Sequence, residues 1–187
     1  MRRRWITLFI IIVVVLLIDQ VSKRWIVENL AVGQTIQPIP ALAPFFQITY
    51  SRNSGSAFGF LPQAGDLFLL IAVVVVIAMF YFYPRIPANG HLTRIAIGMV
   101  CGGALGNALD RLQYGVVIDF IHYQIPGLIS NVSNPADHAI VLGAIIIFLE
   151  SWLHDRGKEA EPSSSAESGD ESVTESSDIE RQKGETR

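Results

Sequence analysis

Hydrophobic residues gather in four long runs, at about residues 5–27, 67–83, 92–109 and 137–152, separated by segments rich in polar residues, prolines and glycines. A helix needs about 20 apolar residues to cross the hydrocarbon core of a bilayer, and each run comes close to that length. The first run follows three arginines, as in a signal peptide, but no small-residue cleavage site follows it. The pattern therefore predicts an all-α membrane protein with four transmembrane helices, the first of them uncleaved.

Basic residues flank these runs at places that share one face of a four-span chain. They come before the first run, between the second and third, and after the fourth: Arg2, Arg3, Arg4, Arg85, Arg94, Arg156 and Lys158. By the positive-inside rule this face is cytoplasmic, so both termini are expected inside. The loops at residues 29–66 and 112–136 then face outward, and Arg52 is the only Lys or Arg within them.

The first outer loop is long enough to hold structure of its own. Residues 45–50 are aromatic or β-branched apart from one glutamine, and prolines and glycines bound them, which favours a β-strand. We expect a small extracytoplasmic β-sheet cradle there, completing a transmembrane domain of residues 1–154. Residues 155–187 hold 10 acidic and 5 basic side chains and few large apolar ones, so they predict a disordered acidic cytoplasmic tail.

Several polar residues interrupt the apolar runs. Asp19 and Lys23 are four positions apart, so they share a helix face and can form an ion pair near the outer end of the first helix. In the third helix, glycines at positions 98, 102 and 106 form a row that lets another helix approach closely. Beside that row, a second line of positions one helical turn apart carries polar groups: Gly103, Asn107, Asp110 and Arg111. Burying the polar side chains of this column in lipid is costly unless each has a partner. The single cysteine, Cys101, excludes a disulfide framework and is expected to be a packing residue.

Two further acids, Asp119 and Asp137, lie on the predicted outer face, 18 positions apart. One interpretation is a catalytic pair of carboxyls at the membrane surface. The alternative is a loop aspartate plus an acid that stabilises a helix start, since Asn134 suits an N-cap and Pro135 the first helical position. That alternative accounts for Asp137 and leaves Asp119 unexplained.

Five motifs in the same order resemble those of the lipoprotein signal peptidases, or signal peptidase II, across about residues 5–152. They are Asp19-Gln20-Val21-Ser22-Lys23, Arg52-Asn53-Ser54-Gly55-Ser56-Ala57-Phe58, Gly103-Ala104-Leu105-Gly106-Asn107-Ala108-Leu109-Asp110-Arg111, Val117-Ile118-Asp119-Phe120 and Asn134-Pro135-Ala136-Asp137. Each motif alone is weak, whereas the set is specific. Two positions depart from the family pattern: Ser133 replaces a usual Phe, and Ser56 a frequent Ala.

The resemblance implies an aspartyl endopeptidase of the bacterial inner membrane that cuts prolipoproteins before a diacylglyceryl-modified cysteine. It implies Asp119 and Asp137 as catalytic residues. The matching positions for binding substrate or supporting the pair are Asn53, Gly55, Asn107, Arg111, Asn134, Ala136, Asp19, Lys23, Gly103 and Asp110. The expected partners are lipid-modified prolipoproteins and membrane lipids, with no nucleic acid, and the expected state is a monomer.

Hydrolysis by two carboxyls requires them to share one proton, because like charges a few ångströms apart cannot both ionise cheaply. The helix start at Asp137 favours its charged form, so Asp137 is the expected base. No metal or other cofactor is expected, since the sequence has no HExxH motif and its four histidines are scattered. Two rival functions remain: an ion-coupled transporter, which predicts acids near the bilayer midplane, and a scaffold protein using the glycine row and the tail.

Overall fold

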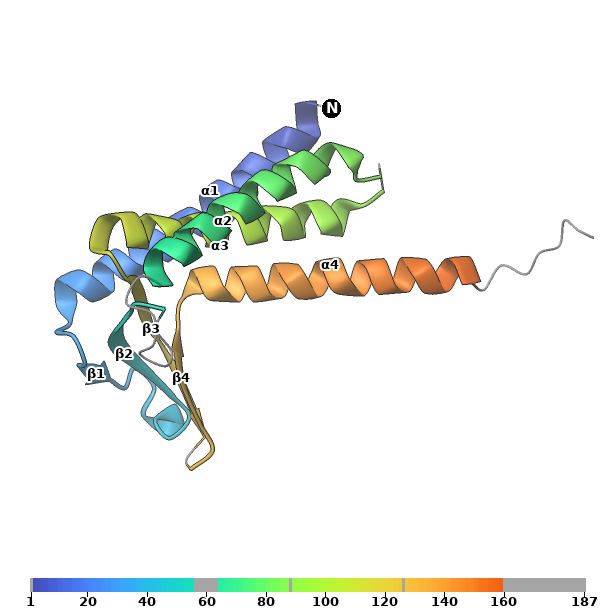
Figure 1. Ribbon diagram of the computed structural model, residues 1–187. Helices are drawn as coiled ribbons and strands as arrows, with labels where there is room; N and C mark the ends of the chain where they lie inside the picture. Colours follow the sequence, from blue (N-terminus) through green and yellow to red (C-terminus); the bar gives the residue numbers. More distant parts are fainter. Residues whose placement is uncertain (1, 56–63, 88, 126, 160–187) are drawn as a thin grey trace, which may run out of the picture. The chain divides into compact units, whose positions relative to one another are not determined.

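The computed structural model describes residues 2–55, 64–87, 89–125 and 127–159. Each predicted apolar run forms a helix (Figure 1): α1 Arg2–Asn29, α2 Ala64–Phe82, α3 His91–Tyr114 and α4 Pro135–Glu159. Their ends lie beyond the predicted ones, except that α2 ends one residue earlier than predicted. All four are long and apolar enough to cross a membrane. The chain divides into two units, Met1–Glu150 and Ser151–Arg187, and the fold described below is that of the first.

The second unit begins with the last turns of α4, where the Arg156 guanidinium lies 4.1 Å from the centre of the Trp152 ring. Because α4 continues to Glu159, the helix extends past the predicted start of the tail at residue 155. The remainder of the predicted tail lies outside the described residues.

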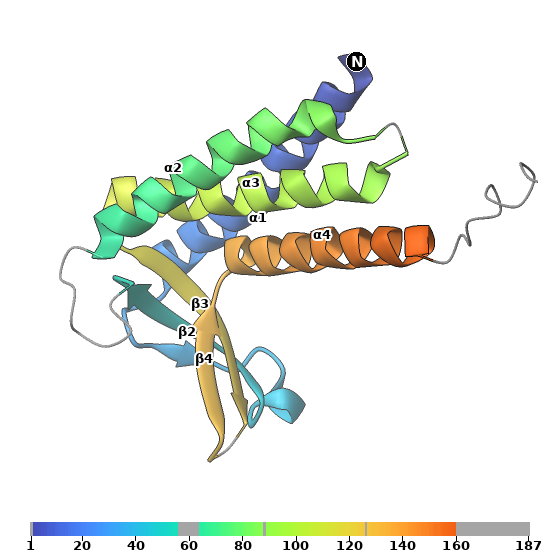
Figure 2. The ribbon, with the colours of Figure 1, turned by 45° about the vertical axis from the view of Figure 1, so that its right-hand side comes forward.

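Helix α3 is the inner helix of the bundle, and Figure 2 shows it between α2 and α4. In its most apolar stretch, 67% of the residues are buried, compared with 17%, 6% and 17% in α1, α2 and α4. The other three helices expose many large apolar side chains, such as Leu17 at 58% and Ile77 at 63%. Lipid is the natural environment for such surfaces, so the burial pattern confirms a multi-pass membrane arrangement.

The predicted glycine row of α3 faces α1. A methyl group at Gly98 would lie 2.8 Å from a side-chain carbon of Ile11, and one at Gly102 would lie 2.7 Å from Cβ of Val15. These separations leave no room for a side chain, so the small residues are what allow the two helices to pack closely. On the other side, Gly103 of α3 packs against the backbone carbonyl of Ala136 in α4.

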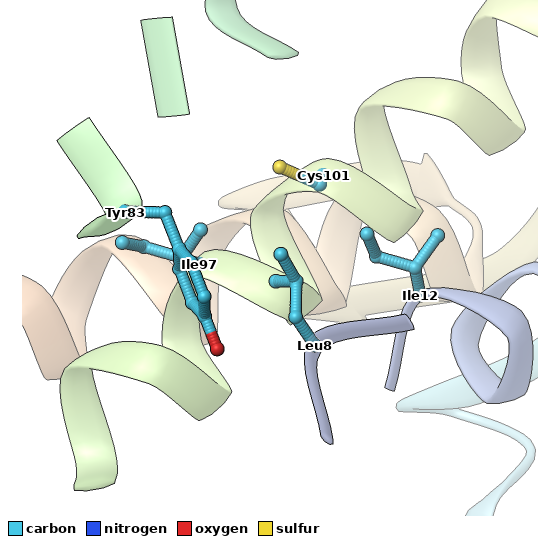
Figure 3. Packing of buried hydrophobic residues seen from close by; sticks show 5 residues of the cluster. All are labelled: Leu8, Ile12, Tyr83, Ile97 and Cys101. Atoms are coloured by element: carbon cyan, nitrogen blue, oxygen red, sulfur yellow. The ribbon is translucent and has the colours of Figure 1, made fainter. Parts of the chain in front are cut away.

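An apolar cluster fills the end of the bundle away from the sheet. Figure 3 shows its members, which come from α1, α3 and the turn after α2: Leu8, Ile12, Tyr83, Ile97 and Cys101. Cys101 is completely buried and carries a free thiol, in keeping with the predicted packing role.

Four antiparallel strands form one sheet in the order β1 Thr35–Ile36, β2 Phe46–Asn53, β3 Val117–Ile125 and β4 Ile129–Ser133. The strand predicted at residues 45–50 is confirmed as β2, while the second outer loop supplies β3 and β4. The register of β2 against β3 shifts between Ile48 and Ser51, and Ser51 then pairs with Asp119. Buried Tyr50, Ile118 and Phe120 pack against Ile26 near the end of α1. This packing fixes the sheet to the end of the bundle where α1 finishes.

Candidate active site

The two aspartates lie where the sheet meets the helices. Asp119 belongs to β3 and is 2% exposed, whereas Asp137 lies in the first turn of α4 and is half-buried. Three asparagines from three different parts of the chain surround them. Asn53 ends β2, Asn107 belongs to α3, and Asn134 directly precedes α4.

Asn134 connects the two aspartates through one side-chain amide. Its Oδ1 accepts a hydrogen bond of 2.9 Å from the backbone N–H of Asp137, which is the N-cap arrangement predicted for the start of α4. Its Nδ2 donates to Asp119 Oδ1 at 2.6 Å. The cap therefore fixes which end of the amide faces Asp119, and it holds β3 and the first turn of α4 together.

Asn107 holds the second carboxyl, that of Asp137, by a hydrogen bond from its side-chain amide. Its Nδ2 donates to Asp137 Oδ1 at 2.7 Å. Its Oδ1 accepts from Lys23 Nζ at 3.1 Å and from Asn134 Nδ2 at 3.2 Å. Because an ammonium only donates, Lys23 determines that the oxygen of Asn107 points toward α1 and its NH₂ group toward Asp137.

Asn53 completes the set from β2. Its Oδ1 accepts a 2.8 Å hydrogen bond from the backbone N–H of Gly55, so its Nδ2 is left to donate to Asp119 Oδ2 at 2.9 Å. Gly55 has a φ of +80°, a conformation that a residue with a side chain rarely adopts. Each of the three amides thus presents its NH₂ group to a carboxyl oxygen, and in each case a second contact fixes that orientation.

These surroundings perturb the acid–base behaviour of Asp119. Burial raises its pKa to about 6, while the hydrogen bonds from Asn53 and Asn134 act in the opposite direction. The negative charge of Asp137 raises the pKa of Asp119 further. Asp119 therefore retains a proton at a pH where an ordinary aspartate is ionised.

A buried ionic cluster lies directly beneath the pair. Lys23 Nζ is 2.9 Å from Asp19 Oδ2 and 2.7 Å from Asp110 Oδ2, and all three side chains are at most 2% exposed. Asp19 Oδ1 accepts from the backbone N–H of Ala136, and Asp110 Oδ2 from that of Ile118, both at 3.0 Å. The cluster thereby anchors the start of α4 and the segment of β3 that precedes Asp119.

Gln20 also belongs to this cluster, although the sequence analysis assigned it no role. Its Nε2 lies 3.0 Å from Asp19 Oδ2, 3.0 Å from Asp110 Oδ1 and 3.3 Å from the backbone oxygen of Gly106. The available signal was its position next to Asp19, directly after a long apolar stretch of the same helix. A glutamine there needs a partner as much as an acid does.

Arg111, the last of the predicted α3 column, lies beside the aspartates. Its guanidinium donates to the backbone oxygen of Asn107 at 3.2 Å and lies 5.3 Å from the centre of the Phe68 ring. Its buried Nε has no hydrogen-bond partner in the part of the chain that the structure describes.

All twelve predicted site residues thus lie in one connected region at the sheet end of the bundle. Two histidines lie beside it: His122 of β3 contacts Thr49 and Ser130 on the sheet, and His138 of α4 contacts the backbone oxygen of Asn134. Among the described residues, no group of three His, Cys, Asp or Glu side chains is placed to hold a metal ion.

Comparison with known proteins agrees with this arrangement. The chain is 41% identical over 155 residues to a lipoprotein signal peptidase from Pelotomaculum thermopropionicum, covering 82% of this chain and 95% of that protein. It is 34% identical over 148 residues to one from Halothermothrix orenii, covering 79% and 97%. A solved bacterial membrane enzyme structure matches with a TM-score of 0.73 and 33% identity, covering 83% of this chain and 93% of that one. The family model for signal peptidase (SPase) II matches residues 11–153. The chain therefore belongs to the signal peptidase II family of membrane proteases.

Proposed function

We propose that this protein removes the signal peptide from prolipoproteins, cutting before a diacylglyceryl-modified cysteine, with Asp119 and Asp137 as its catalytic pair. The observation that carries the proposal is the bridge that Asn134 makes, capping the helix at Asp137 while donating to Asp119. A loop acid and an unrelated helix-start acid need no such bridge. The pair also lies at the ends of the helices, which argues against the midplane site that a transporter predicts.

The two carboxyls differ in the way that peptide hydrolysis requires. Burial raises the pKa of Asp119 to about 6, so Asp119 carries the shared proton. Asp137 is more exposed and lies at the N-terminus of α4, where a negative charge is favoured. Ionised Asp137 removes a proton from the attacking water, while Asp119 donates a hydrogen bond to the scissile carbonyl and later a proton to the leaving amine.

The hydrogen bonds from the asparagine amides do not use all the lone pairs of the Asp119 carboxyl. Each carboxyl oxygen has two lone pairs, and Asn53 and Asn134 occupy one on each oxygen of Asp119. A second lone pair stays available for the proton that the pair shares. Asn53, on the exposed end of β2, is suited to bind the substrate backbone, and Arg111, whose guanidinium contacts the backbone of Asn107, is the second residue that we assign to this role.

The charge pattern supports a bacterial inner-membrane location with both termini in the cytoplasm. Arg3, Arg4, Arg85 and Arg94 belong to the ends of the helices that lie away from the sheet, which the positive-inside rule assigns to the cytoplasm. The sheet and the aspartates then lie at the outer surface. A diacylglyceryl anchor holds the substrate cysteine at the same depth. We also expect the protein to act as a monomer.

The test is cleavage of a lipid-modified prolipoprotein by purified Asp119→Asn and Asp137→Asn variants in detergent. Each change keeps the shape of the side chain but removes its ability to ionise, so we expect the rate to fall by at least about 100-fold. Asp66→Asn is the matched control, because Asp66 is an exposed acid in the first turn of α2 at the same end of the bundle. A normal rate in either dyad variant would refute the assignment.

A further inference from the structure

A cavity bordered by basic side chains lies at the opposite end of the bundle from the aspartates, between the first turns of α1 and α3. Its volume is about 310 Å³, within the range of small ligand pockets, and it is lined by Arg3, Arg4, Thr7, His91, Arg94 and Ile95. None of these lining residues is acidic. The site chemistry described above uses none of them.

The cavity concentrates positive potential from two sources. The guanidinium groups of Arg3 and Arg4 come from α1, and that of Arg94 comes from α3. Both helices also begin here, at Arg2 and His91, and the positive ends of helix dipoles together with unpaired backbone N–H groups favour anions. The N-cap of α3 is Gly90, which has no side chain to cap the helix, although the N–H of His91 donates to the backbone oxygen of Asn89.

The positive-inside rule alone does not account for this arrangement. Basic residues that only set orientation need to reach water, yet Arg94 is 4% exposed and donates to the backbone oxygen of Pro87. The backbone of Arg4 is also fixed, since the hydroxyl of buried Tyr83 donates to its oxygen at 2.5 Å. Arg3 is exposed and Arg4 half-buried, so Arg94 is the fixed member of the three guanidinium groups, a group type that matches the oxygens of a phosphate.

The cavity also borders the lipid-facing surface. Ile95, which lines it, is 38% exposed, and nearby Leu92 at the start of α3 is 59% exposed. A ligand with a phosphate head in the cavity can therefore lay hydrocarbon chains along the exposed apolar surface. Basic pockets between helices at the cytoplasmic face are typical sites for anionic lipid headgroups.

We propose that this cavity binds the phosphodiester headgroup of an anionic phospholipid. The lipid would come from the inner leaflet in the orientation proposed above. Binding would hold the first turns of α1 and α3 together at the end remote from the aspartates.

The test uses the full chain in vesicles that contain the same lipid mixture in both leaflets, so its outcome does not depend on orientation. Trp25→Phe and Trp152→Phe leave Trp5 as the only tryptophan, adjacent to Arg4 and 4.8 Å from the Tyr83 ring between centroids. Trp5 fluorescence is then quenched with phosphatidylglycerol brominated on its acyl chains, and separately with equally brominated phosphatidylcholine. We expect phosphatidylglycerol to quench more strongly at equal bromine content.

Arg4→Gln should weaken the apparent preference for phosphatidylglycerol about five-fold, and adding Arg3→Gln should weaken it by a similar factor again. Arg85→Gln is the matched control, because Arg85 is a basic residue at the same end whose guanidinium lies over the Tyr81 ring outside the cavity. It should keep the full preference. Equal loss in Arg85→Gln would mean general charge attraction and would overturn the proposal.

Inorganic phosphate distinguishes a lipid from a free anion. If the site binds a lipid headgroup, millimolar phosphate leaves the preferential quenching intact, because it lacks the chains that add to lipid affinity. Displacement of the quencher by inorganic phosphate would identify a soluble phosphate site instead. Equal quenching of Trp5 by both brominated lipids, in the protein whose cavity residues are unchanged, would also overturn the proposal.

Discussion

Replacing Lys23 by methionine tests whether the buried ionic cluster supports the catalytic pair. The ammonium of Lys23 is 2% exposed and contacts three groups: Asp19 at 2.9 Å, Asp110 at 2.7 Å and Asn107 at 3.1 Å. Methionine has a similar length and fills the same space without a charge. The variant therefore removes the interactions and leaves little cavity.

The expected loss of stability is large for one substitution. Removing one partner of a buried ion pair costs about 3–5 kcal/mol, because the remaining charge is left without compensation. Here two fully buried carboxyls lose their partner, Asp19 and Asp110, so we expect at least the upper part of that range. Typical unfolding free energies are only about 5–15 kcal/mol, so the variant should be close to unfolding.

The assay measures unfolding of the purified protein as the mole fraction of a denaturing detergent increases, followed by circular dichroism. Arg24→Met is the control on the adjacent residue. Arg24 also forms an ion pair, with Glu28 four positions later on the helix, at 2.7 Å. Both side chains are exposed, so we expect no measurable loss of stability in Arg24→Met. Cleavage is measured in parallel under folded conditions, where Lys23→Met should be slower because Asn107 loses the contact that orients its amide.

A triple variant separates charge from packing. Asp19→Asn and Asp110→Asn added to Lys23→Met remove the uncompensated charges but keep an oxygen acceptor for the backbone N–H groups of Ala136 and Ile118. We expect the triple variant to be more stable than Lys23→Met alone. If Lys23→Met is as stable as Arg24→Met, or if the triple variant is the least stable of all, the reasoning about the cluster is wrong.

Two further substitutions test the pKa of Asp119 and the packing of α3 against α4. The hydrogen bond from Asn53 lowers the pKa of Asp119, so Asn53→Ala should raise that pKa. Because activity requires the shared proton, the alkaline limb of the pH–kcat profile should then move to higher pH. Asn131→Ala on exposed β4 is the control and should leave the profile unchanged. A methyl group at Gly103 would overlap the α4 backbone, so Gly103→Ala should reduce both thermal stability and cleavage. Gly65→Ala, where the nearest atom would be 3.6 Å away, should change neither.

The sequence was sufficient to predict the features that depend on local pattern. Four apolar runs specified the four helices, and Asn134 with Pro135 specified where α4 begins, because a cap side chain acts on a backbone N–H only three residues away. The spacing of Asp19 and Lys23 predicted their contact for the same reason. The glycine row predicted a close helix neighbour, although its identity as α1 required the structure.

Contacts between distant segments could not be derived from local pattern. Asp110 lies 87 positions from Lys23, and nothing in the residues around either one indicates that the two pair. The strands β3 and β4 were not predicted individually, because their residues alternate less regularly than those of a half-exposed sheet. The orientation of the three site amides is set by such distant partners, so it too becomes visible only in the folded chain.

The choice of amides around the aspartates has a physical explanation. An ammonium bonded directly to a carboxyl favours the charged form and typically lowers its pKa by about 1–3 units, which would deprive the pair of its proton. In this protein the charge of Lys23 is compensated by Asp19 and Asp110, and Lys23 contacts the pair only through Asn107. Its effect on the pKa of Asp119 is the smallest of those acting on that residue. Neutral donors hold the carboxyls in place while burial keeps the pKa of Asp119 near 6. The cluster thus supplies rigidity to the site without removing the proton on which hydrolysis depends.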